Sequence, residues 1–124
     1  MKLSVIIPVF NERATIDSII SRVKNVELDS IISTEIIIID DGSTDGTIEA
    51  LASYNNDSSI IIFKQPLNKG KGAAVRKGFE LASGDIYMVQ DSDLEYSPID
   101  YPKLLAPILS NNADVVYGSR FVGG

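Results

Sequence analysis

The sequence predicts an α/β fold built on a mainly parallel sheet. Short runs rich in Ile and Val alternate along the 124 residues with segments that carry apolar residues at helical spacing, a pattern typical of strands joined by crossover helices. The apolar runs do not alternate with polar residues, so both faces of each strand are expected to be covered. With 44% hydrophobic residues the chain can build a core, and we expect one domain, or part of one, over residues 1–124.

Five apolar runs are predicted to be strands, at 3–9, 35–40, 60–64, 85–90 and 114–119. Right-handed crossovers leave few ways to arrange them, and the doubly wound order 3-2-1-4 places the first and fourth strands side by side. Ligands of such folds bind where the strand order reverses, beyond the carboxyl ends of the strands. Polar residues follow the first, second and fourth strands, whereas "KQPLN" after the third strand contains no acid. The binding site is therefore expected between the first and fourth strands.

Helices are predicted in the intervals between the strands. Their apolar positions are Ile16, Ile19, Ile20 and Val23 in the first, Ile48, Leu51 and Ala52 after Asp45 in the second, and Val75, Phe79 and Ala82 after Gly72 in the third. We expect these side chains in the core. A fourth helix is predicted from near Pro98 through Leu104, Leu105, Ile108 and Leu109, kinked or shortened by Pro107.

Composition excludes several classes of function. The 11 Lys and Arg against 17 Asp and Glu give a net charge of -6, which would repel nucleic acid and anionic membrane surfaces at long range. No apolar segment reaches the ~20 residues that span a bilayer, and the N-terminus turns polar too soon for a signal peptide, so we expect a cytoplasmic protein. With no Cys and no His, thiol and imidazole chemistry are excluded. Any metal must have oxygen ligands, which favours magnesium, manganese or calcium.

Asp91 and Asp93 end the fourth predicted strand, in "YMVQDSDLEYSP". Two carboxylates ~4 Å apart repel each other by about 4 kcal/mol at an effective dielectric constant of ~20, and a divalent cation would offset that repulsion. We interpret the pair as a metal clamp on a diphosphate, with Ser92 offering its backbone N–H to a phosphate; the alternative is a solvated turn. Glu95 either supports this site or belongs to the loop that begins the next helix.

Two aspartates also end the second predicted strand, in "IIIIDDGSTDGT". Asp40 would satisfy backbone donors of the loop, while Asp41 would accept hydrogen bonds from a base or ribose, as acids after the second strand do in dinucleotide-binding folds. The alternative is a helix entry without a ligand, since Gly42, Ser43 and Asp45 suit turns and caps.

The stretch "NKGKGAAVRKG", residues 68–78, resembles a phosphate-binding glycine loop that opens a helix. It matches neither common phosphate-loop pattern, and it follows the third strand, away from the expected site. We therefore attribute its small residues to close helix–sheet packing at Ala73 and Ala74. The cations of this stretch are expected to form a solvated face: Lys69, Lys71, Arg76 and Lys77.

Taken together and in order, "VIIPVFNE", "IIIIDDGSTDGT", "NKGKGAAVRKGFELASGD", "VQDSDLEYSP" and "VVYGSRF" resemble the family 2 glycosyltransferases. Within that family the chain is similar to the polyprenyl-phosphate branch. The resemblance implies a Rossmann-like GT-A fold that binds a nucleotide-sugar of GDP-mannose or UDP-glucose type. It also implies inverting transfer of the sugar to a polyprenyl phosphate, with Mg²⁺ or Mn²⁺ on the donor diphosphate.

The same resemblance implies roles for individual residues. The nucleoside would be surrounded by Pro8, Phe10, Glu12, Ile39 and Asp41. The diphosphate would be held by Asp91, Ser92 and Asp93, with Asp91 and Asp93 on the metal and Glu95 close by. The catalytic residues would be Asp93 and Arg120, with Arg120 beside the phosphates or the acceptor.

Members of this family continue beyond "GSRFVGG", so we expect the fold to be truncated at its C-terminal side. Membrane contact would then come only through the acceptor or those further segments, at the cytoplasmic face of the membrane in the full-length protein. Two alternatives stay open: a sugar hydroxyl acceptor, and a non-catalytic nucleotide-binding fragment. A phospho-receiver domain is disfavoured, because it needs an acid pair after strand one and an aspartate after strand three, where this chain has Glu12 and "KQPLN".

Overall fold

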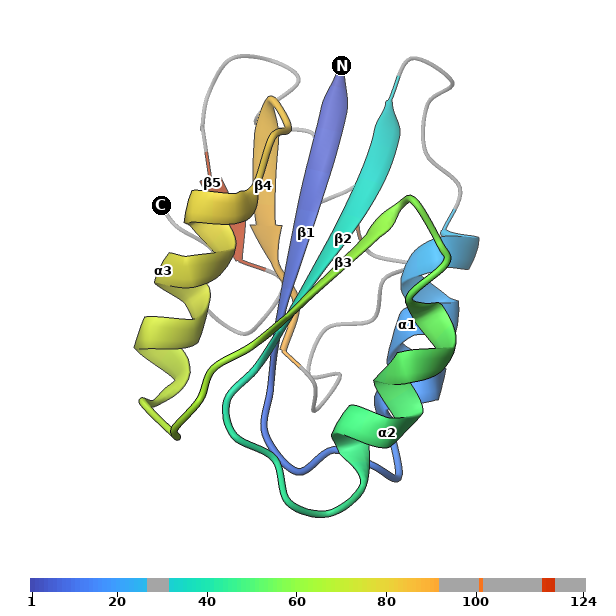
Figure 1. The fold of residues 1–124 in the computed structure, drawn as a ribbon. Coiled ribbons are helices and arrows are strands. Elements are labelled where there is room, and N and C mark those ends of the chain that lie inside the picture. Colours follow the sequence, from blue (N-terminus) through green and yellow to red (C-terminus); the bar gives the residue numbers. More distant parts are fainter. Residues whose placement is uncertain (27–31, 92–100, 102–114, 118–124) are drawn as a thin grey trace.

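A computed structural model of the chain describes residues 1–26, 32–91, 101 and 115–117 (Figure 1). Five parallel strands form one sheet in the order β3-β2-β1-β4-β5. The strands are β1 (Lys2–Val9), β2 (Ser33–Asp40), β3 (Ile60–Lys64), β4 (Ile86–Val89) and β5 (Val115–Tyr117). The predicted order 3-2-1-4 is confirmed, and β1 and β4 are neighbours paired from Leu3 with Ile86 to Ile6 with Val89.

Helices cover both faces of the sheet in three layers, with α1 and α2 on one side and α3 on the other (Figure 1). They are α1 (Ile16–Asn25), α2 (Thr47–Leu51) with a following 3-10 turn, η1 (Ala52–Tyr54), and α3 (Lys71–Leu81). The predicted apolar stripe of α1 is fully buried. Ala52 was expected in the core but is exposed, because the α-helix ends at Leu51 and the tighter 3-10 turn rotates the next residues away from the sheet. The fourth predicted helix lies outside the described residues apart from Tyr101, which is fully buried.

Side chains of β1, β2, β3 and β4 alternate between two cores, one on each face. On the α1 and α2 face the core contains Leu3, Val5, Ile7, Val9, Ile36, Ile38, Ile86 and Met88. On the α3 face it contains Ile6, Ile37, Ile39 and Val89, packed against Ala74 of α3. This period of two explains why the strands read as unbroken apolar runs, because both of their faces are covered.

Close packing of α3 on β1 depends on small residues. Ala74 is fully buried, as predicted, whereas Ala73 is half-buried. Gly78, one turn further along the helix, lies so near β1 that a Cβ atom there would come within 2.4 Å of Ile6 Cγ2. The small residues of α3 therefore let the helix approach the sheet.

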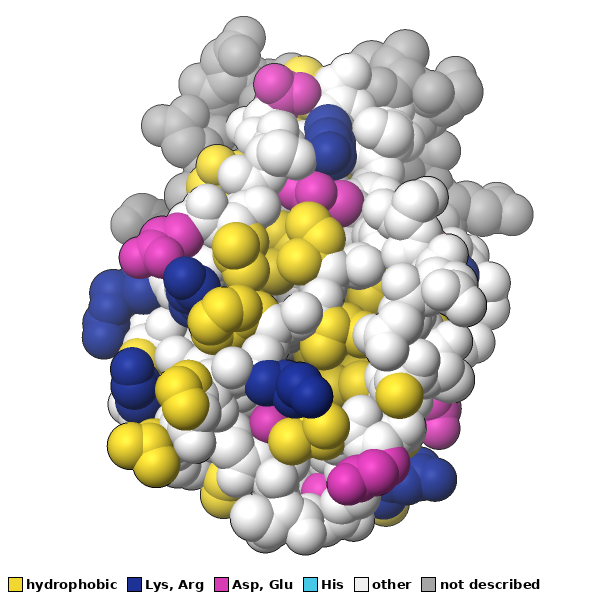
Figure 2. All heavy atoms as spheres, viewed as in Figure 1, with side chains coloured by type: hydrophobic (Ala, Val, Ile, Leu, Met, Phe, Trp, Pro, Cys, Tyr) yellow, Lys and Arg dark blue, Asp and Glu magenta, His cyan; other side chains and the backbone are white. Residues whose placement is uncertain are grey.

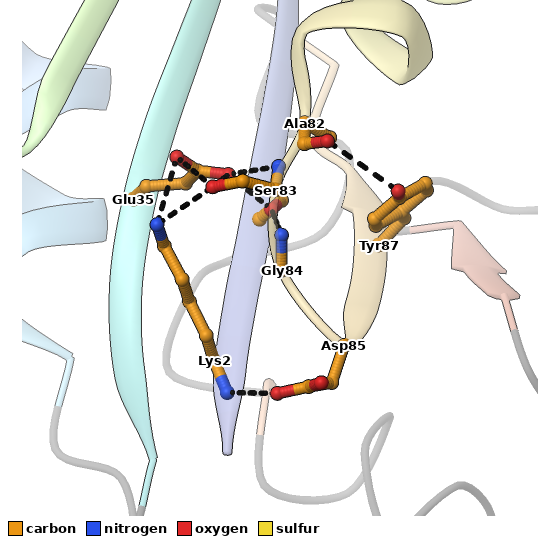
Figure 3. A network of polar contacts seen from close by, with 8 residues as sticks. Lys2, Glu35, Ala82, Ser83, Gly84, Asp85 and Tyr87 are labelled. Atoms are coloured by element: carbon orange, nitrogen blue, oxygen red, sulfur yellow. Dashed lines mark hydrogen bonds and ion pairs between the residues drawn. The ribbon is translucent and has the colours of Figure 1, made fainter.

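A buried carboxylate joins three segments at the amino ends of the strands (Figure 3). Glu35 of β2 accepts hydrogen bonds from Ser4 Oγ of β1 and from the backbone N–H of Ser83 at 2.7 Å, and Lys2 Nζ lies 3.3 Å from its Oε1. Burial alone would raise the pKa of Glu35, but these hydrogen bonds, with that from Ser83 Oγ, hold it below its ordinary value. The network fixes the turn between α3 and β4, at the end of the sheet opposite the predicted site.

The face that carries β3 and α3 is only partly covered. Figure 2 shows hydrophobic side chains across the middle of this view, with Lys or Arg side chains at its left, just below its middle and near its top. Half-buried Ile61, Phe63, Val75 and Phe79 pack against the α3-side core, and Lys77 Nζ lies 4.6 Å from the centre of the Phe63 ring.

Within the described part of the chain, no helix has the length and hydropathy needed to cross a membrane.

Candidate functional site

A cavity of about 210 Å³ opens beyond the carboxyl ends of β1, β2 and β4, where the strand order reverses. Its walls are formed by Pro8, Val9, Phe10, Glu12, Asp41, Lys71, Ala74 and Asp91. Five of these eight residues are among those predicted for the nucleotide-sugar site: Pro8, Phe10, Glu12, Asp41 and Asp91. The structure thus brings together residues that are as much as 83 positions apart in sequence at the place where the doubly wound topology predicts a ligand.

Alternation along the strands determines which aspartates face the cavity. Strand-like pairing continues just past β2 and β4, since the N–H of Asp41 bonds Val9 O at 2.8 Å and that of Gln90 bonds Ile6 O at 2.8 Å. Ile39 and Val89 point to the α3 face, so Asp41 and Asp91, two residues later in each segment, fall on the same face. Asp40 and Gln90 fall on the opposite face. Both aspartates of the cavity wall therefore lie on the side from which α3 approaches.

Asp41 is 4% exposed and holds the loop before α3 against the site. Its Oδ1 accepts hydrogen bonds from Gln65 Nε2 and from the backbone N–H of Lys69, both at 2.8 Å, and its Oδ2 accepts one from the N–H of Gly70 at 2.9 Å. Gly70 has φ 94°, a conformation that favours glycine. Asp41 therefore both lines the cavity and fixes the backbone just before Lys71.

The loops after β1 and β2 are joined to each other, which shapes the cavity rim. As predicted, Asp40 accepts hydrogen bonds from loop donors, the N–H groups of Gly42 and Ser43, at 3.2 and 3.0 Å. Ser43 Oγ accepts from the N–H of Asn11 at 2.8 Å, and Asn11 Oδ1 accepts from the N–H of Thr44 at 2.8 Å. These bonds hold the segment that presents Phe10 and Glu12.

Asp91 forms an ion pair with Lys71, the first residue of α3. Its side chain is 62% exposed, as expected for a solvated face, but the expectation that this stretch lies away from the site is wrong, because Lys71 lines the cavity. The physical reason is the path of the crossover. In the sheet, β2 and β1 lie between β3 and β4, so α3 must cross both of them on its way from β3 to β4. Its first residue thereby reaches the carboxyl end of β4. The order 3-2-1-4 shows that this helix crosses towards β4, but not how far its first residue reaches.

A second contact that sequence reasoning missed holds the backbone next to Asp91. The Tyr101 hydroxyl donates to Gln90 Oε1 at 2.9 Å, and Gln90 Nε2 donates to the carbonyl of Asp91 at 3.1 Å. Burial raises the pKa of the Tyr101 hydroxyl, so it remains a donor at neutral pH. No motif marks Tyr101, because its partner becomes clear only when the chain is folded.

The remaining predicted residues differ in what the structure says of them. Ile39 is fully buried among Ile6, Ile37 and Val89 and is not in the cavity wall, so its contact with a nucleoside stays a prediction. Ser92, Asp93, Glu95 and Arg120 lie outside the described residues. In the described part of the chain, no three acidic side chains are grouped to hold a metal; Asp91 is the predicted metal ligand that the structure places.

Comparison with known proteins gives the family. The model of "Glycosyl transferase family 2" matches residues 4–124. The dolichol-phosphate mannosyltransferase of Pyrococcus furiosus is 38% identical over 124 residues, which is 100% of this chain and 34% of that protein. An undecaprenyl-phosphate 4-deoxy-4-formamido-L-arabinose transferase of Salmonella choleraesuis is 38% identical over 107 residues, 85% of this chain and 33% of that protein. The chain thus spans about a third of the length of these relatives.

The fold has a solved counterpart in a glucosyl-3-phosphoglycerate synthase of Mycobacterium tuberculosis, crystallised with Mn²⁺, UDP and glucosyl-3-phosphoglycerate. The two are 32% identical with a TM-score of 0.69, over 88% of this chain and 40% of the other. This likeness and the parallel sheet confirm the predicted Rossmann-like GT-A fold class. On the family match across residues 4–124, the chain belongs to glycosyl transferase family 2.

Proposed function

We propose that the protein transfers a sugar from a nucleoside-diphosphate sugar to a polyprenyl phosphate, with inversion at the anomeric carbon, and that residues 1–124 form its donor-binding part. The observation that carries the proposal is the meeting of Asp41, Asp91 and Lys71 around one cavity at the switch in strand order. The two relatives named for transfer involving dolichol phosphate and undecaprenyl phosphate support a lipid-phosphate acceptor.

The cavity suits a nucleoside at one end and a diphosphate at the other. Pro8 and the half-exposed ring of Phe10 offer apolar surface to a base. Asp41 already accepts three hydrogen bonds and has about one lone pair left, on Oδ2, for a ribose hydroxyl. Lys71 and the residues after β4 would face the phosphates. A donor of GDP-mannose or UDP-glucose type would fill both ends of the cavity.

The residues present fit a divalent metal. Asp91 is a largely buried carboxylate that already attracts a cation, since Lys71 Nζ lies against its Oδ1. Oxygen ligands of this kind suit Mg²⁺ and Mn²⁺, and the M. tuberculosis counterpart was crystallised with Mn²⁺ and UDP. We propose that Asp91 and Asp93 hold the ion. When bound, it would neutralise charge on the departing nucleoside diphosphate.

The acceptor explains how transfer proceeds without a strong base. A phosphate monoester oxygen is ionised at neutral pH and can attack the anomeric carbon directly, from the face opposite the leaving group. Arg120 would stabilise negative charge on the phosphates or the acceptor. If the acceptor is lipid-linked, the protein would work at the cytoplasmic face of a membrane.

The direct test is a transfer assay on the full-length parent protein. It would use radiolabelled GDP-mannose and UDP-glucose, polyprenyl phosphate in detergent, and recovery of label in the lipid phase. We expect metal-dependent transfer that is lost in Asp91→Asn and kept in Glu80→Gln, which removes an exposed carboxylate of α3 outside the cavity. Transfer only to a soluble hydroxyl acceptor would contradict the lipid-phosphate proposal, and absence of transfer would favour a nucleotide-binding role.

A further inference from the structure

We infer that Lys71 couples metal binding to nucleotide binding. Its ammonium group is paired with the Asp91 carboxylate in the free protein and moves to the diphosphate when nucleotide and metal bind together. The inference rests on the proposed function and assigns a role in it to a residue that the sequence patterns placed on a solvated surface.

The contact between Lys71 and Asp91 lies inside the cavity wall. Both residues line the cavity, and Lys71 Nζ pairs with Asp91 Oδ1. The Asp91 side chain is 10% exposed, whereas that of Lys71 is 62% exposed. Among the described residues Lys71 is the cation that pairs with Asp91, so the buried partner is fixed at the end of β4 and the exposed partner is free to leave it.

The same carboxylate is the predicted metal ligand, so Lys71 and a metal compete for it. A divalent ion next to Asp91 would meet the ammonium group at close range, where like charges repel strongly in a partly buried site. Metal binding without a nucleotide therefore requires that Lys71 first leave Asp91. In the free protein the lysine supplies the positive charge that the metal supplies in the complex.

The backbone of Lys71 stays in place while its side chain moves. The N–H groups of Lys69 and Gly70 are both held by Asp41, at 2.8 and 2.9 Å, and Lys71 begins the helix that packs on β1. A lysine is a flexible four-carbon stem that carries a compact charge. From this fixed base it can swing from Asp91 to a diphosphate in the same cavity.

The exchange makes the two ligands cooperative. If the metal or the nucleotide binds alone, it bears the whole free-energy cost of breaking the Lys71–Asp91 pair. If both bind, that cost arises only once. Binding of one ligand therefore strengthens binding of the other by the same factor, as linkage requires. Removing the lysine should leave only the direct attraction between metal and phosphate.

The test measures Mn²⁺ binding to the chain from the electron paramagnetic resonance signal of free Mn²⁺, with and without saturating UDP or GDP. For the unaltered chain we expect weak binding alone and much tighter binding with the nucleotide. Lys71→Gln should tighten binding of Mn²⁺ alone by roughly tenfold, as loss of a nearby like charge predicts, and reduce the enhancement by nucleotide. Lys71→Arg, which keeps the charge, should behave like the unaltered chain.

A matched control is Arg76→Gln, which removes the same charge from the same helix at an exposed position outside the cavity; it should leave Mn²⁺ binding unchanged. Equal or weaker binding of Mn²⁺ alone by Lys71→Gln would overturn the inference while leaving the proposed function standing. If the unaltered chain bound no Mn²⁺ even with nucleotide, the metal part of the proposed function would fail together with the inference. Thermal unfolding of each variant checks that the fold is kept.

Discussion

Replacing Gly78 by alanine tests whether α3 is held against the sheet as closely as the structure shows. The new Cβ would lie 2.4, 3.1 and 3.3 Å from Cγ2, Cγ1 and Cβ of Ile6, all shorter than or at the limit of ordinary carbon contacts. Ile6 is fully buried in a central strand, so it cannot move aside cheaply. Overpacking of this kind costs about 1–3 kcal/mol, and the better helix propensity of alanine returns about 0.8–1.0 kcal/mol.

The net expectation is that Gly78→Ala lowers the free energy of unfolding by up to about 2 kcal/mol, measured by urea denaturation. Gly72→Ala, in the same helix, is the control. A Cβ there would touch only the end of the flexible Arg76 side chain, at 3.5 Å from Nη1, so we expect it to raise the free energy of unfolding by about 0.5–1 kcal/mol. If the two variants change stability by the same amount and sign, the close packing of α3 on β1 is not as described.

Three further predictions concern other parts of the fold. Glu35 has a pKa below its ordinary value of 4.5 in the folded protein, so its stabilising contribution is present above that value and is lost as the pH falls below it. Glu35→Gln should therefore be less stable at neutral pH and show a flatter curve of stability against acid pH. An unchanged curve would contradict this. Asp41→Ala should weaken nucleoside binding and speed hydrogen exchange at the amides of Lys69 and Gly70 while the sheet stays protected; full protection of both amides would refute the role of Asp41 in the loop. Tyr101→Phe should lower the free energy of unfolding by about 0.5–1.5 kcal/mol through loss of one buried hydrogen bond, and an unchanged urea midpoint would argue against that bond.

The fold could be predicted because its signals are local. Apolar runs and helical spacing gave the five strands and the first three helices, and handedness of the crossovers gave the strand order. Ala52 was misplaced because the step from α-helix to 3-10 turn after Leu51 leaves no mark in the apolar pattern.

The site was predicted where its residues lie at, or a few residues past, the carboxyl end of a strand. Asp41 and Asp91 follow β2 and β4, so topology alone brings them together. Lys71 was missed because its place depends on how far a crossover helix travels across the sheet, and Tyr101 because its hydrogen bond to Gln90 joins separate segments in the folded state. Residues that reach a site from a helix or from a remote segment need the three-dimensional arrangement.

The central claim is that Asp91 and its neighbours bind a nucleoside diphosphate through a divalent metal. Calorimetric titration of UDP and GDP into the chain, with Mn²⁺ or Mg²⁺ and then with excess chelator, tests it most directly. We predict that one nucleotide binds measurably with metal, that the chelator abolishes most of this affinity, and that Asp91→Asn does the same while Glu80→Gln does not. Equal affinity in excess chelator, or an Asp91→Asn variant that binds as well as the unaltered chain, would contradict the account.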